Sequence, residues 1–338
     1  MRELKASSYD FILPSELIAS KPANPPDSAR LLVYNRSTDK ISHHIFKDLL
    51  SFLDDYCLIL NNTKVVKARI FGHKITGAKI ELLLNKPLPE KSFLVFIRGK
   101  VKLEDELIFD ENLKAVICGI NDDGSRIVRF FQEGISLDAS RVFEVFDKIG
   151  HMPLPPYINR ADEKSDETDY QTLFAKHSGS VAAPTASLHF TPEMLADIQK
   201  KCTTAFLTLH VGAGTFKPVE CENINEHKMH SEYFHIEDNT AKLIDSNSKI
   251  LAVGTTATRT IEYYSRTKTT NGECDLFLNP TNKPKRVDAI LTNFHLPKST
   301  LLMLVASFVG LEKALDLYKI AIDKKYRFYS YGDAMLIL

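Results

Sequence analysis

The sequence predicts an α/β fold: a layered α/β domain of discontinuous sequence that carries an inserted small all-β barrel domain. Two observations predict it. Continuous apolar segments followed by helical patterns lie on either side of a middle region in which apolar and polar residues alternate between frequent turn residues. In addition, 338 residues with 44% hydrophobic and 25% charged residues have ordinary globular composition and suffice for about two domains.

The barrel is expected over residues 69–148, and the discontinuous α/β domain over residues 1–68 and 149–338. Segments such as KITGAKIELLLN and SFLVFIRG alternate with period two and are separated by Gly, Pro, Asn and Asp. This spacing favours a small antiparallel barrel or sandwich. The clearest hairpin turn is the run Asn-Asp-Asp-Gly at 121–124.

Four strands of the α/β domain are each expected to run into a polar or glycine-rich segment. In open α/β sheets, ligands bind beyond the carboxyl ends of the strands. Any one such segment is better explained as a capped turn, but four together favour a shared pocket. The strands cover 56–60, 205–209, 250–253 and 289–292, and the segments after them are NNTK, HVGAGT, GTTATR and NFHLPKST.

The composition limits which partners the chain can bind and in which compartment it is expected. The 43 Lys and Arg residues balance 43 Asp and Glu residues, so a polynucleotide would have to bind at a local patch. No segment approaches the roughly 18 apolar residues of a membrane span, and the five scattered cysteines form no close pair of the zinc-knuckle type. We therefore expect a cytoplasmic protein, monomeric by default, without membrane attachment.

The segment after the strand at 250–253 favours an anionic group. Gly254 permits a tight turn, and Thr255 and Thr256 are suited to cap the helix that follows. Free amides at such a helix start attract a carboxylate or phosphate, and Arg259 would lie in the first turns to assist. Structural capping alone explains the residues equally well.

The segment HVGAGT at 210–215 supplies an imidazole and two glycines. Gly212 and Gly214, followed by Thr215, allow the backbone to approach a planar ligand such as adenine, and His210 is a candidate acid or base. The segment lacks both the third glycine of a dinucleotide fingerprint and the ending of a P-loop. A tight bend with a hydrogen-bonded histidine is the alternative.

Two further segments carry polar candidates. His230 and Glu232 lie in HKMHSE, which lacks the third ligand and the helical spacing of a zinc site, so hydrogen bonding to a ligand is favoured and no metal is expected. Asn293 and His295 precede an apolar helix that opens with a hydroxyl cap. They are positioned to face whatever fills the pocket.

The C-terminal segment interleaves cations and aromatic residues. Lys324, Arg327, Tyr329 and Tyr331 form a combination that contacts phosphates and stacks on unpaired bases, although a buried strand explains the aromatics equally well. Asp333 follows, and a carboxylate at this place would stabilise a nearby sulfonium.

Taken together, these segments resemble the ribosyltransferase-isomerase family of queuosine biosynthesis. The resemblance follows the family's pattern in order and covers essentially the whole chain. It rests on GHMPLPPYI (150–158), DYQTLFA (169–175), VAAPTASLHFT (181–191), LHVGAGTFKPV (209–219), HKMHSE (227–232), AVGTTATRTIE (252–262), TNFHLPKSTLLMLV (292–305) and YRFYSYGDAML (326–336).

The resemblance implies an α/β domain with an inserted barrel and a defined reaction. The ribosyl part of S-adenosylmethionine, a co-substrate and not a prosthetic group, would be transferred to 7-aminomethyl-7-deazaguanine at the tRNA wobble position and isomerised. Epoxyqueuosine-tRNA, adenine and methionine are the implied products. A base that removes a C5′ hydrogen beside the sulfonium and a donor near adenine would serve this chemistry. The candidates for proton transfer and sulfonium stabilisation are His210, His230, Glu232 and Asp333.

The chain departs from the family's pattern at four places. Pro26 and Asn62 stand where the family commonly has Arg and Asp, Ser187 replaces a usual Gly, and PTNKP at 280–284 replaces a Pro-Gly-aromatic loop. Two other hypotheses compete with the resemblance. One is a non-catalytic tRNA-binding protein that uses the C-terminal segment, and the other is an ordinary methyltransferase, which the missing Rossmann fingerprint disfavours.

Overall fold

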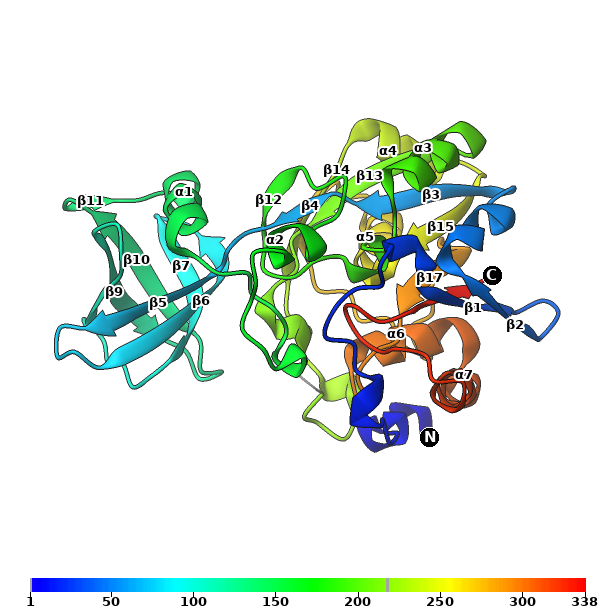
Figure 1. Ribbon diagram of the computed structural model, residues 1–338, viewed down its shortest axis with the longest axis horizontal. Helices are drawn as coiled ribbons and strands as arrows, with labels where there is room; N and C mark the ends of the chain where they lie inside the picture. The colour runs from blue at the N-terminus through cyan, green and yellow to red at the C-terminus, as the bar shows by residue number, and fades with distance from the viewer. Residues whose placement is uncertain (1, 217–218) are drawn as a thin grey trace.

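The computed structural model describes residues 2–216 and 219–338, and the side chains of Thr215 and Phe216 lie outside that description. Figure 1 shows two bodies joined by extended segments: a larger one with helices around a sheet, and a smaller one built of strands. The two chain termini both lie in the larger body.

The larger body is built on a nine-stranded sheet whose four middle strands, β13, β3, β15 and β17, run parallel. Their carboxyl ends therefore meet at one edge of the sheet. In sheet order the strands are β16 (Asn271–Cys274), β14 (Glu232–Ile236), β13 (Thr204–Leu209), β3 (Tyr56–Asn61), β15 (Lys249–Val253), β17 (Ala289–Asn293), β18 (Ala334–Ile337), β1 (Arg30–Asn35) and β2 (Lys40–Ile45).

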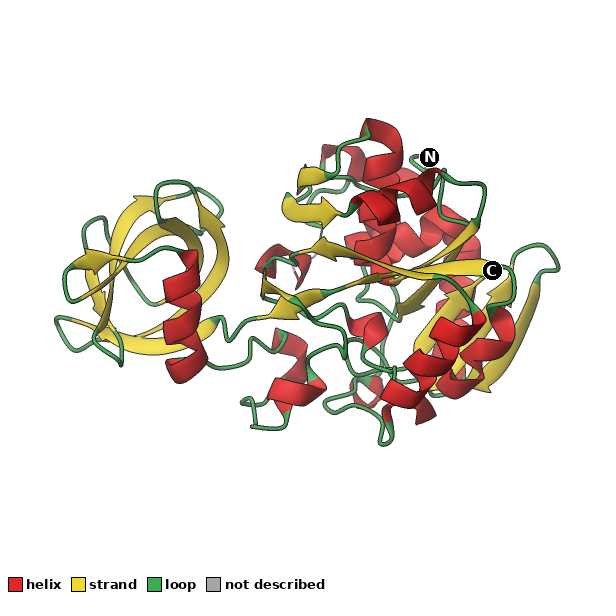
Figure 2. Cartoon of the chain, turned by 90° about the horizontal axis from the view of Figure 1, so that it is seen from above, coloured by secondary structure: helices red, strands yellow, loops and turns green. Residues whose placement is uncertain are grey.

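Helices cover both faces of this sheet, as the view in Figure 2 shows. Alternate strand residues point to opposite faces, so Leu58 and Leu251 pack with α3 while Ile59 and Ile250 pack with α5. Burial on both faces explains why these strands are continuously apolar. The helices are α3 (Pro192–Lys201), α4 (Asp238–Asp245), α5 (Gly254–Thr267), α6 (Thr300–Val309) and α7 (Leu311–Asp323).

The smaller body is a closed barrel. Six strands follow the order β10-β7-β6-β5-β8-β9, and the ring closes because β9 also pairs with β10, while β11 adds to the edge of β10. Helix α1 packs Val142, Val145 and Phe146 into the barrel core. The elements are β5 (Arg69–Lys74), β6 (Lys79–Leu88), β7 (Ser92–Arg98), β8 (Glu106–Ile108), β9 (Leu113–Ile120), β10 (Arg126–Gln132), β11 (Ile135–Ser136) and α1 (Ala139–Ile149).

A short parallel ribbon, β4 (Thr63–Val65) with β12 (His177–Ser180), lies where the chain leaves and re-enters the larger body. Helix α2 (Asp166–Asp169) lies in the returning segment. Short 3-10 helices complete the fold: η1 (Arg2–Leu4), η2 (Ala6–Tyr9), η3 (Ser15–Leu17), η4 (Pro26–Ser28), η5 (Phe46–Phe52), η6 (Pro156–Ile158), η7 (Thr185–Ser187), η8 (Ala213–Phe216) and η9 (Ile224–Glu226).

The predicted fold class is confirmed. All four expected strands are present as β3, β13, β15 and β17, and the expected hairpin turn joins β9 to β10 with Gly124 at φ 84°. The predicted domain division stays a prediction, although α1 runs to Ile149, one residue past the expected boundary. Among the described residues, no helix is both long enough and apolar enough to cross a membrane.

Candidate active site

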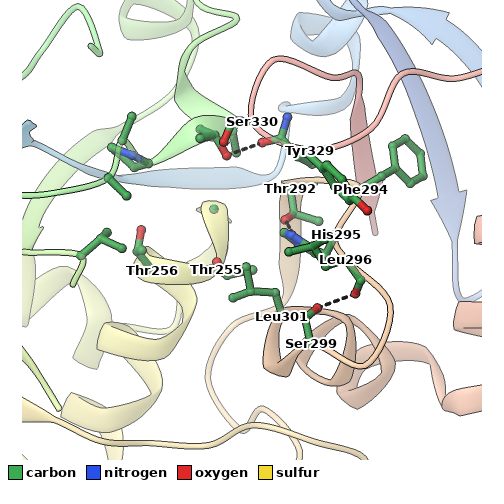
Figure 3. Close-up of a pocket in the computed structure, with 18 of the residues that line it drawn as sticks. Thr255, Thr256, Thr292, Phe294, His295, Leu296, Ser299, Leu301, Tyr329 and Ser330 are labelled. Atoms are coloured by element: carbon green, nitrogen blue, oxygen red, sulfur yellow. Dashed lines mark hydrogen bonds between the residues drawn. The ribbon is translucent and has the colours of Figure 1, made fainter. Parts of the chain in front are cut away.

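A cavity opens at the carboxyl edge of the parallel strands. This main cavity encloses about 670 Å³ of empty space, with its mouth and the open solvent there included. Figure 3 shows the start of α5 with Thr255 and Thr256 on one side and the loop with Tyr329 and Ser330 on another. Residues 292–296, which end β17 and follow it, form a further wall. The strand exits of β15 and β17 thus meet in one pocket, and Val211 adds the exit of β13.

The first turn of α5 lines this cavity with Gly254, Thr255 and Thr256. The residue before the helix is Val253, which offers no side-chain cap, and Gly254 at φ 89° makes the sharp entry from β15. The predicted threonine cap is absent, because Thr255 and Thr256 lie inside the helix and Val253 occupies the cap position. The amides of the first helical turn are therefore available to an anion.

Asn293 and His295 contribute neutral polar groups to the cavity wall. Asn293 accepts a hydrogen bond from the Thr185 hydroxyl at 2.9 Å, and its amide nitrogen lies 3.3 Å from His189 Nε2. His295 shares a hydrogen bond of 2.8 Å with Thr292. Burial lowers the pKa of His295 to about 3 and that of His189 to about 4, so both imidazoles are neutral at pH 7.

His210 lies beside the main cavity and does not line it. Its Nδ1 shares a hydrogen bond of 2.8 Å with the buried Thr63 hydroxyl, and its ring stacks on Tyr233 with centroids 5.7 Å apart. Burial, with a smaller contribution from His177, lowers its pKa to about 4. Its neutral imidazole can therefore accept a proton but does not supply a positive charge at pH 7. A side chain at residue 179 would collide with this ring, which explains the glycine there.

Glu232 and Arg259 form a buried ion pair with each other, so neither charge is free. Arg259 also donates to the carbonyls of Leu276 and Cys274, at 3.0 and 3.3 Å. Glu232 accepts from the Gly212 amide at 3.0 Å and so holds the glycine segment after β13. The sequence suggested that Arg259 binds the carboxylate of a ligand and that Glu232 is a catalytic carboxylate. In the structure the two residues bind each other instead.

A smaller side cavity, of about 390 Å³ with its mouth, surrounds this ion pair and shares Leu301 with the main cavity. The expected residues Gly214 and His230 line it. His230 is exposed and its ring lies directly against Gly214, so that only glycine fits there. The side chain of Thr215 lies outside the described part of the chain. The sequence thus predicted one site where the structure has two adjoining cavities.

Of the four C-terminal residues expected to contact nucleic acid, the two tyrosines are buried. Tyr331 is 1% exposed and donates to the buried Asp166 carboxylate at 2.8 Å, so it cannot stack on a base. Tyr329 is also buried but lines the main cavity. Lys324 is exposed, whereas Arg327 pairs with Asp333 at 3.1 Å. The alternative explanation of the aromatics, burial, accounts for Tyr331 and Tyr329.

Asp333 is a loop anchor in this structure. It is 1% exposed and accepts from the backbone amides of Arg30 and Arg327, at 3.0 and 2.8 Å, as well as from the Arg327 guanidinium. It does not line the main cavity. Its saturated carboxylate fixes the loop that carries Tyr329 and Ser330.

Two asparagines that the sequence did not single out tie the site together. Asn61 donates to the Leu209 carbonyl at 3.0 Å and to the Thr256 hydroxyl at 3.2 Å, and so links the ends of β3 and β13 to α5. Asn85, at a bulge in β6 of the barrel, accepts from the Ala213 amide at 2.8 Å. The polar segment NNTK at the end of β3 was the available signal for Asn61. The alternation of apolar and polar residues in β6 gives no sign that Asn85 contacts the glycine segment.

The family description that matches this chain is "Queuosine biosynthesis protein", over residues 6–337. The chain belongs to this family. It is 62% identical over 336 residues to the S-adenosylmethionine:tRNA ribosyltransferase-isomerase of Aliarcobacter butzleri, and 60% identical over 338 residues to that of Sulfurimonas denitrificans, with 99% of each chain covered.

A solved structure of the queuosine biosynthesis family also matches. The S-adenosylmethionine tRNA ribosyltransferase of Thermotoga maritima is 36% identical, with a TM-score of 0.55 over 98% of this chain and 100% of that one. The resemblance inferred from the sequence is confirmed, and with it the assignment of the chain to a family of transferases.

Proposed function

We propose that the chain transfers the ribosyl group of S-adenosylmethionine to 7-aminomethyl-7-deazaguanine at the tRNA wobble position and isomerises it. Epoxyqueuosine-tRNA is the product, and adenine and methionine are released. The names of the relatives supply the two substrates, S-adenosylmethionine and tRNA. We further propose that the chain acts as a monomer in the cytoplasm.

The observation that carries this proposal is the uncapped start of α5 inside the main cavity. S-adenosylmethionine carries a carboxylate at one end, and the amides at residues 254–256 offer it hydrogen bonds and the positive end of the helix dipole. Arg259 is already paired with Glu232. We therefore assign the binding of the substrate carboxylate to these amides and not to the Arg259 guanidinium.

The remaining walls of the main cavity suit a sulfonium and a neutral nucleoside. None of the described lining residues is Lys, Arg, Asp or Glu, and the two histidines, His189 behind the wall and His295 on it, are neutral at pH 7. The aromatic rings of Tyr157, Phe294 and Tyr329 line the space. A cation is attracted by aromatic faces, so we assign sulfonium stabilisation to these rings instead of Asp333.

We propose His210 as the base. The sulfonium acidifies the neighbouring C5′ hydrogens, and a neutral imidazole with one nitrogen fixed by Thr63 can accept a proton from that carbon. Glu232 and Arg259 act as positioning residues that hold Gly212 and the segment around it. His230, at the open side cavity, stays a candidate for a later proton transfer.

Chromatography of the products tests the proposal. The purified chain is incubated with S-adenosylmethionine and with tRNA that either carries or lacks the deazaguanine. We expect free adenine and methionine only with the modified tRNA. Adenine release that ignores the modification would contradict the substrate assignment, S-adenosylhomocysteine would indicate a methyltransferase, and tRNA binding without either product would indicate a non-catalytic protein.

A further inference from the structure

The hydroxyl of Tyr170 is buried and lacks a hydrogen-bond partner among the described residues. Tyr170 is 0% exposed, and the Ser330 side chain and the Ala183 amide approach its oxygen without reaching hydrogen-bonding geometry. A buried polar group without a partner costs about 1–3 kcal/mol, so native proteins rarely leave one without a reason.

The neighbouring tyrosines are satisfied. Tyr331 packs edge-on against Tyr170, with ring centroids 5.9 Å apart, and donates to Asp166 at 2.8 Å. Tyr157 shares a hydrogen bond of 2.6 Å with Ser330. The hydroxyls of Tyr331 and Tyr157 therefore both have hydrogen-bond partners within the protein. Of these three tyrosines, Tyr170 alone has none among the described residues.

The position of Tyr170 suggests what completes its hydrogen bonding. Tyr170 lines the main cavity together with Tyr157 and Ser330. The hydroxyls of Thr172 and Ser187 also lack a partner, but neither residue lines this cavity. Burial raises the pKa of Tyr170 and of Tyr157, so both hydroxyls remain protonated at neutral pH.

We propose that the Tyr170 hydroxyl hydrogen-bonds the adenosine end of the bound S-adenosylmethionine, on a wall completed by Tyr157 and Ser330. This inference rests on the proposed function and names the residues that recognise one end of the substrate. The carboxylate end is assigned to the amides of α5, because amides complement an anion.

The chemistry of the wall supports the adenosine end. A neutral hydroxyl both donates and accepts, which matches sugar hydroxyls and the ring nitrogens of a base. The rings of Tyr157 and Tyr329 lie with centroids 4.5 Å apart and planes tilted by 51°, and both add apolar ring surface to the cavity wall beside these hydroxyls. A nucleoside presents the same combination of flat ring and polar edge.

The test is Tyr170→Phe with Tyr331→Phe as the matched control. Calorimetric titration measures the affinity of the full chain for S-adenosylmethionine and for 5′-methylthioadenosine, which lacks the amino-acid end, and thermal unfolding measures stability without ligand. We expect Tyr170→Phe to weaken both ligands by about tenfold while the melting temperature stays the same or rises, since no protein hydrogen bond is lost. Tyr331→Phe should lower the melting temperature and keep the affinity.

Each outcome decides between the proposals. If the wild-type chain binds S-adenosylmethionine and Tyr170→Phe binds it equally well, this inference is overturned while the proposed function stands. A lower melting temperature for Tyr170→Phe would show that the hydroxyl has a protein partner, which also overturns it. If the wild-type chain binds neither ligand, the proposed function itself fails.

Discussion

Two cavities adjoin at the same edge of the sheet, and they differ in how their polar groups are satisfied. In the side cavity, Glu232 and Arg259 neutralise each other and fill their remaining hydrogen bonds with backbone groups. In the main cavity, the amides that open α5 lack a side-chain cap, and the Tyr170 hydroxyl lacks a partner within residues 2–216 and 219–338. The buried charges of the side cavity are paired within the protein, while the main cavity contains hydrogen-bond donors that no side chain of the described residues uses.

This difference separates structural from ligand-binding roles. A saturated buried network specifies the fold, whereas unused donors in a cavity lower the free energy only when a ligand arrives. Charge alone would have indicated the side cavity, because it holds the buried ions. The unpaired hydrogen-bond donors indicate instead that the main cavity is the ligand site.

The largest expected effect comes from breaking the ion pair of the side cavity. Arg259→Met leaves the Glu232 carboxylate buried without its partner, so we expect the free energy of unfolding to fall by about 3–5 kcal/mol. Chemical denaturation measures the loss. The double variant Arg259→Met with Glu232→Gln should recover much of it, because it removes both charges.

The exposed pair Arg141 and Glu144 provides the control. Both side chains are more than half exposed, so Arg141→Met should cost less than about 1 kcal/mol. A similarly small cost for Arg259→Met would mean that the side cavity is hydrated and its charges are available to a ligand.

The second effect is a loss of stability in mild acid. Burial holds the pKa of His189 near 4 and that of His295 near 3, below the ordinary value of about 6.5. As the pH falls from 6.5 to 4, the unfolded chain binds protons that the folded chain refuses, so the free energy of unfolding falls. The loss is on the order of 3 kcal/mol for each residue.

Denaturation curves at several pH values measure this dependence. The variant His295→Asn should show a shallower fall of stability between pH 6.5 and 4 than the wild-type chain. Equal slopes for the two proteins would mean that His295 is protonated in the folded state, and that the wall of the main cavity is not neutral.

The third effect concerns the main cavity alone. Thr255→Asp places a carboxylate beside the amides of α5, and we expect it to weaken S-adenosylmethionine binding by at least about tenfold relative to Thr255→Asn. Thr255 is buried, so thermal unfolding of both variants separates a loss of stability from a loss of binding. Equal affinities of the Asp and Asn variants, measured by titration calorimetry, would place the ligand's carboxylate elsewhere.

The smallest effect tests the contact between the barrel and the glycine segment after β13. Asn85→Ala removes the acceptor of the Ala213 amide, and the lost hydrogen bond is worth about 1 kcal/mol. Because the glycine segment is then held less firmly, the rate of adenine release should fall by about threefold to tenfold. Lys79→Ala, at an exposed position on the same strand, should leave the rate unchanged. Equal rates for the two variants would show that the barrel does not position this segment.

The sequence predicted the fold and the edge of the sheet at which the main cavity lies. Strands buried on both faces are continuously apolar, and the polar segments after β15 and β17 do meet in the main cavity. Both features follow from local sequence, because period and turn residues are local properties. The hydroxyl cap of α6 was predicted for the same reason, and Ser299 accepts from Leu302 at 3.2 Å.

The partners of the charged candidates could not be predicted in this way. Arg259 and Glu232 are 27 residues apart in the chain, and only the packing of α5 against β14 joins them. Tyr170 reaches the main cavity from a loop, and Asn85 reaches the glycine segment from a barrel bulge. Whether a buried hydroxyl is satisfied depends on such distant contacts, so Tyr170 and Tyr331 look alike in the sequence.

A crystal structure of the chain with S-adenosylmethionine bound tests the assignment of the two cavities most directly. We expect the carboxylate within hydrogen-bonding distance of the amides at residues 254–256, the adenosine against Tyr170, and the ion pair of Glu232 and Arg259 intact. A ligand found in the side cavity, with its carboxylate on Arg259 and Glu232 displaced, would contradict this assignment.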